Sequence, residues 1–424
     1  MNIHCMGLEA DLQGWAYWPG REELSIEFSR LLGAAQEGAA TIAECFATAA
    51  RIDFSDDHSW HREWKKTADA SCKRGSDAFS RGNLLTARSN WLRAINYYQT
   101  AAFPLDLADE TRQAVIARMR ECAGHYVRHG SPRGEVVSIP WPGGYPLEGY
   151  FLPAPATSGA APAMICIGEP GQRKEEYLFK VARHAADRGI ALLAVDLLGT
   201  GPESQFAQVV GRSDLEMTVG HITDYLVERG DVDKRRIAIL ADGWGSSFVA
   251  RGIAFDDRFA AAVCDGGIWD LHERALLGNR AYRAAGPVGR ARPSRAARNI
   301  KCPVLISAGE RGWLKAERVR ELYEELEAEG RDVTLKIFTR EETAASQGHA
   351  DNPTLANEFI FDWLAARLEI RAQVSTTTFR RAFSRRFSRF ERTWVSSSSC
   401  WPLSSAKMNS FNASCCAARF ARCL

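Results

Sequence analysis

Residues 237–248 read IAILADGWGSSF, which is an apolar strand followed by a glycine-rich turn and the start of a helix. In a G-x-S-x-G turn between a strand and a helix, the central residue holds a nucleophilic side chain above the edge of a sheet. Here the five positions of the turn are Ala241, Asp242, Gly243, Trp244 and Gly245. The central residue is therefore a glycine, which has no side chain that can attack a substrate.

Three kinds of group beside this turn remain available for chemistry. Asp242 either faces a pocket as an acid or takes a solvated or hydrogen-bonded surface position. Ser246 and Ser247 follow by one helical turn, where side chains point into the helix packing, so we disfavour a shifted serine nucleophile. The backbone N–H of Trp244 can donate to an oxyanion, because a backbone donor needs no particular side chain.

The elements that must position this turn change character near residue 131. Before it, apolar residues recur at three- and four-residue spacing in four segments that glycine, proline or aspartate separates. We therefore expect four packed helices, with Asn83 and Asp109 as N-caps or first-turn residues of the third and fourth. After residue 133 the spacing becomes that of strands.

Residues 134–154 read as two alternating strands around a Pro-Gly-Gly turn. Short apolar strands then recur with amphipathic segments between them, which favours parallel pairing with right-handed crossovers. The expected strands are residues 163–167, 191–196, 236–241, 260–267, 303–310 and 334–339. This order predicts an α/β fold in which an antiparallel hairpin leads into a mostly parallel, doubly wound sheet.

Three regions follow from these patterns: a helical domain at residues 1–132, a sheet domain at 133–370 and a tail at 371–424. The tail carries ten Lys and Arg residues against a single acid, Glu391, and it contains 11 serines, four cysteines and no glycine. Because it lacks the periodicity that packing requires, we expect a disordered extension outside the fold. A basic arm for nucleic acid or anionic lipid is the disfavoured alternative.

The composition of the chain favours a cytoplasmic protein. The sequence shows neither a signal-peptide pattern nor about 18 consecutive apolar residues, so we expect no membrane contact. Its 11 cysteines are scattered without CxxC or Cys/His ligand spacing, which favours reduced thiols. We expect neither a metal nor another cofactor, and a small molecule rather than nucleic acid as the partner.

The chain resembles the FrsA-like branch of the α/β-hydrolase superfamily, which includes 2,6-dihydroxypseudooxynicotine hydrolases and fungal hydrolases that shorten polyketides. The motifs that carry the resemblance lie within roughly residues 50–368 and include GNLLTARSNWLRAINYY, VSIPWPGGYPLEGYFLPA, GEPGQRKEEY, AVDLLGTGPES and DNPTLANEFIFDWL. The resemblance implies an α/β-hydrolase fold, a helical N-terminal region that forms part of a lid and a homodimer contact, and a Ser-Asp-His site that cleaves C–C or ester bonds beside a ketone.

The positions that the resemblance assigns to the Ser-Asp-His triad hold other residues. The nucleophile position is Gly243, the acid position after the strand 303–310 is Gly312, and the histidine position four residues before Asp351 is Gln347. In such a triad the acid orients a histidine, which takes the proton of the serine. Three replacements together predict that this triad is lost.

Two residues stand out as candidates for proton transfer. His349 lies in the loop after the last expected strand, where a general acid or base can reach the reaction, although a loop histidine is as often simply exposed. Glu273 stands where the resemblance puts an additional active-site acid, and a partly apolar pocket would raise its pKa. The alternative for Glu273 is a helix-start glutamate.

Further residues would frame the pocket. Glu310 either orients His349 or pairs with Arg311. The turn that contains Glu169 would form an oxyanion hole with the N–H of Trp244, and Gln347 would line the same space. The large side chain of Trp244 would favour an aromatic or polyketide-like ligand.

These residues predict an enzyme that acts without hydrolysis on a ketone-bearing aromatic or polyketide-like substrate, through an oxyanion hole and general acid/base groups. The reaction would be a cyclisation, a C–C cleavage, an elimination or an isomerisation. Two alternatives stay open. One is a catalytically inactive homologue that binds a ligand or a partner, and the other is a C–C or ester serine hydrolase with an unrecognised nucleophile.

Overall fold

The computed structural model describes residues 17–106, 109–140, 146–155, 159–168, 173–197, 215–243, 245–266, 295–312 and 315–370. The helical and sheet regions belong to one compact unit, residues 1–371. The change from helices to strands falls between residues 128 and 135, while the domain boundary at residue 132 stays a prediction. The expected tail, 371–424, lies outside the described residues.

Before residue 131 the described chain forms five helices, α1 (Glu22–Gly33), α2 (Ile42–Ala49), α3 (Asp57–Ser80), α4 (Leu84–Ala102) and α5 (Glu110–Arg128). Four segments were expected, because the spacing of apolar residues continues through α1 and α2. Gly38 separates these two helices with a left-handed backbone (φ 76°), which glycine adopts without strain. Thr41 then caps α2, since its hydroxyl accepts a hydrogen bond from the backbone N–H of Glu44 at 3.2 Å.

The two N-cap positions expected from the sequence, Asp109 and Asn83, differ in their hydrogen bonds. Asp109 caps α5 by accepting from the backbone N–H of Thr111 at 2.7 Å. Asn83 occupies the N-cap position of α4, but its side chain makes no capping hydrogen bond. Large aromatic side chains fill the space between the helices, and those that are buried include Trp60, Trp64, Trp91, Tyr97 and Tyr98.

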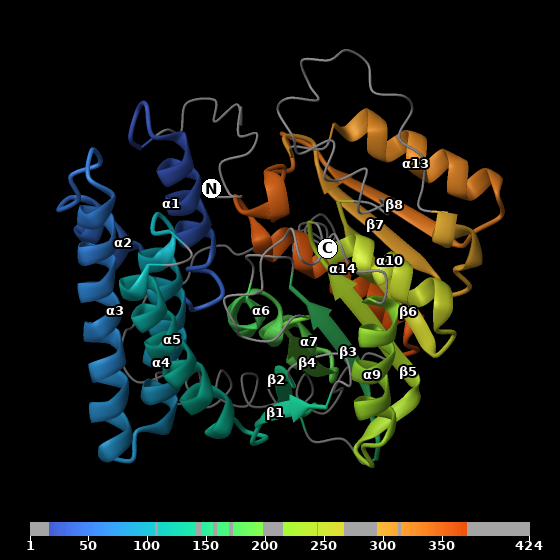
Figure 1. Cartoon of the computed structure of the whole chain (residues 1–424), viewed down its shortest axis with the longest axis horizontal. Coiled ribbons are helices and arrows are strands. Elements are labelled where there is room, and N and C mark those ends of the chain that lie inside the picture. Colours follow the sequence, from blue (N-terminus) through green and yellow to red (C-terminus); the bar gives the residue numbers. More distant parts are fainter. Residues whose placement is uncertain are drawn as a thin grey trace, which may run out of the picture. The chain divides into compact units, whose positions relative to one another are not determined.

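The strands are β1 (Glu135–Ile139), β2 (Leu147–Leu152), β3 (Ala161–Ile167), β4 (Ala191–Val195), β5 (Val232–Ala241), β6 (Phe259–Asp265), β7 (Val304–Gly309) and β8 (Val333–Phe338). They form one eight-stranded sheet in the order β1-β2-β4-β3-β5-β6-β7-β8 (Figure 1). The β1–β2 and β2–β4 pairs are antiparallel, and the remaining pairs are parallel. The expected antiparallel hairpin and doubly wound parallel sheet are therefore confirmed.

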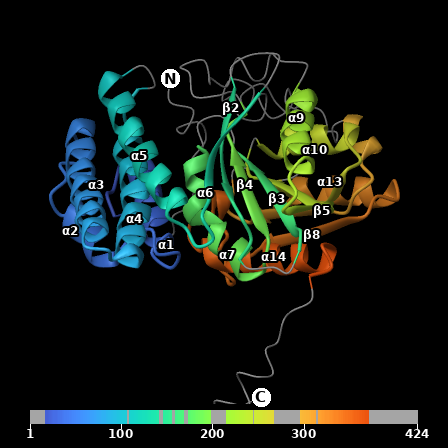
Figure 2. The same ribbon diagram turned by 90° about the horizontal axis from the view of Figure 1, so that it is seen from below.

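Helices cover both faces of this sheet, as a parallel sheet requires (Figure 2). On one face, α9 (Leu215–Val227), α10 (Gly245–Phe255) and α13 (Ala316–Ala328) pack side chains such as Ile222, Phe248 and Leu322 against the strands. On the other face, α6 (Lys174–Lys180), α7 (Ala182–Asp187) and α14 (Pro353–Arg367) contribute Tyr177 and Phe361. No helix among the described residues combines the length and the apolar character that crossing a bilayer requires.

Glu37 lies in the loop between α1 and α2 and connects the helical region to two helices that cover the sheet. Its carboxylate accepts hydrogen bonds from Arg183 at 2.8 and 2.9 Å and from the Thr354 hydroxyl at 2.6 Å, and it lies 3.1 Å from Nε2 of His184. Arg183 and His184 belong to α7, and Thr354 to the first turn of α14. We call Glu37, Arg183, His184 and Thr354 the Glu37 cluster.

The helical region also contacts the segment that precedes α14. A Cβ atom on Gly33 would lie 2.7 Å from the carbonyl oxygen of Ala350 and 2.9 Å from Cδ of Pro353. These distances are below van der Waals contact, so only glycine fits at the end of α1. The loop that carries His349 therefore packs directly against the first helix of the described chain.

Candidate functional site

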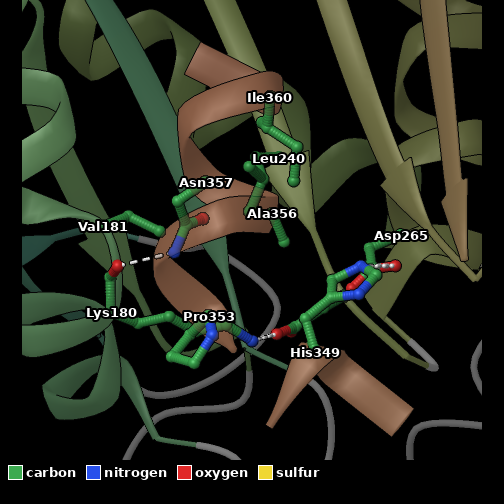
Figure 3. Close-up of a pocket in the computed structure, with 10 residues that line it drawn as sticks. Lys180, Val181, Leu240, Asp265, His349, Pro353, Ala356, Asn357 and Ile360 are labelled. Atoms are coloured by element: carbon green, nitrogen blue, oxygen red, sulfur yellow. Dashed lines mark hydrogen bonds and ion pairs between the residues drawn. The ribbon is translucent and has the colours of Figure 1, made fainter. Parts of the chain in front are cut away.

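Four ionisable side chains meet near the carboxyl ends of the central strands. Asp242 directly follows β5, Asp265 is the last residue of β6, and Lys180 is the last residue of α6. His349 lies after β8 in a 3₁₀ turn, Gln347–His349. Figure 3 shows the side chains of Lys180, Asp265 and His349 converging from these separate elements, and Asp242 lines the same pocket. We call Lys180, Asp242, Asp265 and His349 the edge cluster. Ligand sites of open α/β sheets lie at this edge.

His349 is buried, with 2% of its surface exposed, and its imidazole ring is fixed at both nitrogens. Nδ1 lies 2.7 Å from the carbonyl oxygen of Ala344, and Nε2 lies 3.1 Å from Oδ1 of Asp265. The Ala344 carbonyl oxygen can only accept, so Nδ1 donates to it, and beside an ionised Asp265 carboxylate Nε2 donates as well, which is the arrangement of an imidazolium. The backbone of His349 is left-handed (φ 57°), a conformation that a non-glycine residue keeps only where its surroundings hold it.

The charges of this pair stabilise each other. Burial alone would lower the pKa of His349, but the Asp265 carboxylate and the Ala344 carbonyl outweigh burial and raise that pKa above its ordinary value. Burial alone would raise the pKa of Asp265, but His349, Lys180 and Ser307 hold the pKa of this carboxyl below its usual range. Both shifts favour the imidazolium–carboxylate form of the pair, in which Nε2 carries a transferable proton.

Lys180 and Asp242 form a second ion pair beside the first. The Tyr177 hydroxyl lies 3.2 Å from Oδ1 of Asp242 and 2.8 Å from the carbonyl oxygen of Ile167. Asp242 is buried, so of the two positions expected for it, the solvated surface one does not apply. Burial acts to lower the pKa of Lys180, but the attraction of Asp242 raises it, and the ammonium stays charged.

The edge cluster shares a small pocket with side chains from α14, from β5 and from the residue that follows α6. The pocket has room for about one water molecule. Its other lining residues are Val181, Leu240, Pro353, Ala356, Asn357 and Ile360 (Figure 3). This space is too small for an organic substrate. The pocket therefore does not itself enclose an organic ligand.

With this geometry established, the chain can be compared with known proteins. The family model described as Esterase FrsA-like matches residues 50–282, which is more than half of the chain. The chain belongs to the FrsA-like family. The expected resemblance to that branch of the α/β-hydrolases is thus confirmed.

Relatives of this FrsA-like chain include fungal proteins. It is 26% identical to the hydrolyase poxO of Penicillium oxalicum, over 70% of this chain and 68% of that protein. It is 30% identical to the hydrolase LUC6 of Fusarium sp, over 57% of this chain and 60% of that protein. It is 28% identical to the 20-hydroxy-prefusarin hydrolase FUS2 of Gibberella moniliformis, over 59% of this chain and 61% of that protein. The chain thus spans about three fifths of the last two proteins.

Solved structures agree on the fold of this FrsA-like chain. The 2,6-dihydroxy-pseudo-oxynicotine hydrolase aligns with a TM-score of 0.61 at 20% identity, over 80% of this chain and 95% of that chain. AbyA5 aligns with a TM-score of 0.56 at 20% identity, over 84% of this chain and 99% of that chain. At such identities the likeness establishes the α/β-hydrolase fold and nothing finer.

The elbow turn of the FrsA-like chain is built as expected around Gly243, which has a left-handed backbone (φ 52°). Its carbonyl oxygen accepts a hydrogen bond from the buried Ser246 hydroxyl at 2.7 Å, so this hydroxyl points back into the turn. Ser247 is buried as well. Trp244, Glu169 and Glu273 lie outside the described residues, and their proposed roles stay predictions.

The remaining candidates flank the edge cluster. Gln347 begins the 3₁₀ turn that ends at His349. Glu310 follows β7 and is exposed, and its carboxylate accepts a hydrogen bond from the backbone N–H of Arg340 at 2.8 Å. In the described residues Asp265, and not Glu310, contacts the ring of His349. The sequence analysis missed Asp265, although a carboxylate at the end of an apolar strand is a usable signal. It also missed Lys180, for which the sequence offers no signal.

Proposed function

We propose that this FrsA-like protein is an enzyme that moves protons on a ketone-bearing, aromatic or polyketide-like substrate without a nucleophilic side chain. The observation that carries the proposal is the Asp265–His349 pair, a charged proton donor held near an elbow turn whose centre is Gly243. The printed names of the relatives, which include a 20-hydroxy-prefusarin hydrolase, support a substrate of this class. The loss of the Ser-Asp-His triad is part of the proposal.

The chemistry follows from the charge state of the pair. Glu273 removes a proton from the carbon beside the ketone, and the electrons of that C–H bond form a C=C bond. The ketone oxygen meanwhile takes the proton from Nε2 of His349, and the product is an enol. Asp265 stabilises the imidazolium before the transfer, and its hydrogen bond to Nε2 must open for the proton to reach the ketone, while the Ala344 carbonyl continues to hold Nδ1. An enol of this kind is an intermediate of cyclisation, elimination and isomerisation, whereas retro-aldol cleavage forms its enol by breaking a C–C bond and would need the base to act on a β-hydroxyl group instead.

The oxyanion hole assigned to the turn with Glu169 and to the N–H of Trp244 would bind the ketone oxygen, with Gln347 beside it. The Lys180–Asp242 pair adds no net charge to the site. It places a fixed cation near Asp265, which helps to keep that carboxylate ionised. A homodimer and a cytoplasmic location complete the proposal as predictions from the sequence.

An exchange experiment tests the proton transfer directly. An aryl 1,3-diketone in D₂O should acquire deuterium at its α-carbon faster with the protein than without it, as followed by proton NMR. Glu273→Gln and His349→Gln should each reduce this rate by about 100-fold, the usual contribution of general acid–base catalysis. The exposed His58 provides the matched control, and His58→Gln should leave the rate unchanged. Equal rates in all variants would contradict the proposal.

One observation favours a second candidate, a ligand- or partner-binding protein without catalytic activity. Both nitrogens of His349 are occupied and its ring is buried, so proton transfer requires this pair to open. If the protein only binds, aryl diketones should raise its melting temperature and show no exchange above the buffer rate. A fluorophosphonate probe distinguishes the third candidate, because stoichiometric labelling of the wild-type protein would reveal a nucleophile.

A further inference from the structure

Two cysteines that the proposed function does not use face each other inside the helical region. Cys72 lies on α3 and Cys122 on α5, 50 positions apart in the sequence, and their Sγ atoms are 3.4 Å apart. Both are free thiols. Cys122 is fully buried, while Cys72 retains 7% exposure. The two sulfur atoms are thus already in van der Waals contact, and of the two residues only Cys72 keeps any exposed surface.

The surroundings of the pair favour negative charge on Cys72. The Cys122 thiol donates its hydrogen to Sγ of Cys72, and Nη2 of Arg118 lies 3.6 Å from the same sulfur atom. The hydrogen bond from Cys122 and the charge of Arg118 lower the pKa of Cys72 below that of an ordinary thiol. The pKa of Cys122 is raised, because its proton is held in the hydrogen bond to Cys72 and by burial. Of the two thiols, Cys72 is therefore the one that more readily becomes a thiolate.

We propose that Cys72 and Cys122 are an oxidation site that reacts with a hydroperoxide and closes reversibly to a disulfide between α3 and α5. The Cys72 thiolate attacks the terminal oxygen of hydrogen peroxide, the O–O bond breaks, and hydroxide leaves and takes up a proton as water. The sulfur of Cys122 then attacks the sulfenic acid on Cys72, its proton is transferred to the departing hydroxyl, and a second water leaves. In sum, two thiols and one peroxide give one disulfide and two waters.

The disulfide would close a chain loop that contains the whole of α4. Closing the bond requires the sulfur atoms to approach from 3.4 Å to about 2.05 Å, which small side-chain rotations can achieve. Because the bridge restricts the unfolded chain, the oxidised protein should melt about 3–8 °C higher than the reduced protein.

The experiment uses the reduced full chain with one equivalent of hydrogen peroxide. Digestion without reductant and mass spectrometry should identify a Cys72–Cys122 disulfide, and dithiothreitol should remove it. Cys122→Ser should stop the reaction at the sulfenic acid, which dimedone traps on Cys72. Arg118→Gln should slow the oxidation of Cys72 several-fold, because only the hydrogen bond from Cys122 would then favour the thiolate.

Cys45 provides the matched control, because it is fully buried in the same helical region and its pKa is raised to about 12, mainly by burial. Cys45→Ser should leave the rate and the site of bridging unchanged. Mapping the disulfide in the wild-type protein needs no substitution, so this measurement tests the proposal even if a substituted chain folds poorly. Oxidation of Cys45 or Cys302 at the rate of Cys72, or no bridge between Cys72 and Cys122, would overturn the proposal.

Discussion

The Glu37 cluster and the edge cluster contain the same histidine–carboxylate contact in different surroundings. The distance is 3.1 Å both from Nε2 of His184 to Glu37 and from Nε2 of His349 to Asp265. Glu37 also binds Arg183 through two hydrogen bonds and Thr354 through a third, so its acceptor capacity is filled by groups that join helices. Asp265 lies at the end of a strand, beside a small pocket and a second ion pair. The histidine–carboxylate contact alone therefore does not distinguish the two clusters. The edge cluster is the candidate site because of its position and its neighbours.

The largest expected effect is the loss of the Glu37 carboxylate. Glu37→Ala leaves Arg183 and His184 without their buried acceptor and should lower the free energy of unfolding by about 3–5 kcal/mol, as for other broken buried pairs. Urea denaturation measures this change. The exposed Glu22 on α1 is the control, and Glu22→Ala should stay within about 0.5 kcal/mol of wild type. A loss below about 1 kcal/mol for Glu37→Ala would show that the cluster does not hold the two regions together.

A smaller loss is expected at the edge cluster. Asp265→Asn removes the charge that faces His349 but keeps the size of the side chain, and it should cost about 1–3 kcal/mol. The pKa of His349 should fall, because burial would then act on the ring without the opposing carboxylate. NMR titration of the His349 ring measures this shift. An unchanged pKa would mean that the Ala344 carbonyl alone keeps the ring protonated.

His349 of the edge cluster and Glu37 should lose their contributions to stability at opposite ends of the pH range. The pKa of His349 is raised above 6.5, so its contribution is complete below that value and is lost as pH rises through the higher folded pKa. Despite opposing burial, His184, Arg183 and Thr354 lower the pKa of Glu37 to about 2, so its contribution is present above pH 4.5 and is lost as pH falls toward about 2. The free energy of unfolding, measured with urea at a series of pH values, should lose its decrease at high pH in His349→Gln and its decrease at low pH in Glu37→Gln. A loss at low pH in His349→Gln and at high pH in Glu37→Gln would contradict this interpretation of the two pairs.

The smallest effect is expected at the centre of the elbow. Gly243→Ser places a non-glycine residue at φ 52° and should cost about 1–2 kcal/mol. We expect no stoichiometric labelling of this variant by a fluorophosphonate, because both nitrogens of His349 are occupied and neither can accept the serine proton. Gel fluorescence of the labelled protein measures the result. Rapid labelling would show that the Asp265–His349 pair opens readily.

The sequence predicted the fold well because strand spacing is a local signal. The expected strand 191–196 corresponds to β4 at Ala191–Val195, and the expected strand 334–339 to β8 at Val333–Phe338. The break between α1 and α2 was missed, since apolar spacing continues across it and only Gly38 and Thr41 mark it.

The candidate site was only partly predictable. Asp242 and His349 were chosen from the sequence, and the structure places both of them in the edge cluster. Their partners Lys180 and Asp265 come from α6 and β6, and the contacts exist only because α6 packs on the sheet and β6 pairs with β5 and β7. Which carboxylate faces His349 is a property of strand order, and no local pattern contains that information.

The close approach of Gly33 to Ala350 and Pro353 has a consequence for engineering. The helical region is not an interchangeable module, because its first described helix forms one wall of the loop that carries His349. A hybrid that joins this sheet to the helices of another family member should keep its histidine in place only if the donor has glycine at the equivalent of residue 33. Residues more than three hundred positions apart therefore have to be transplanted together.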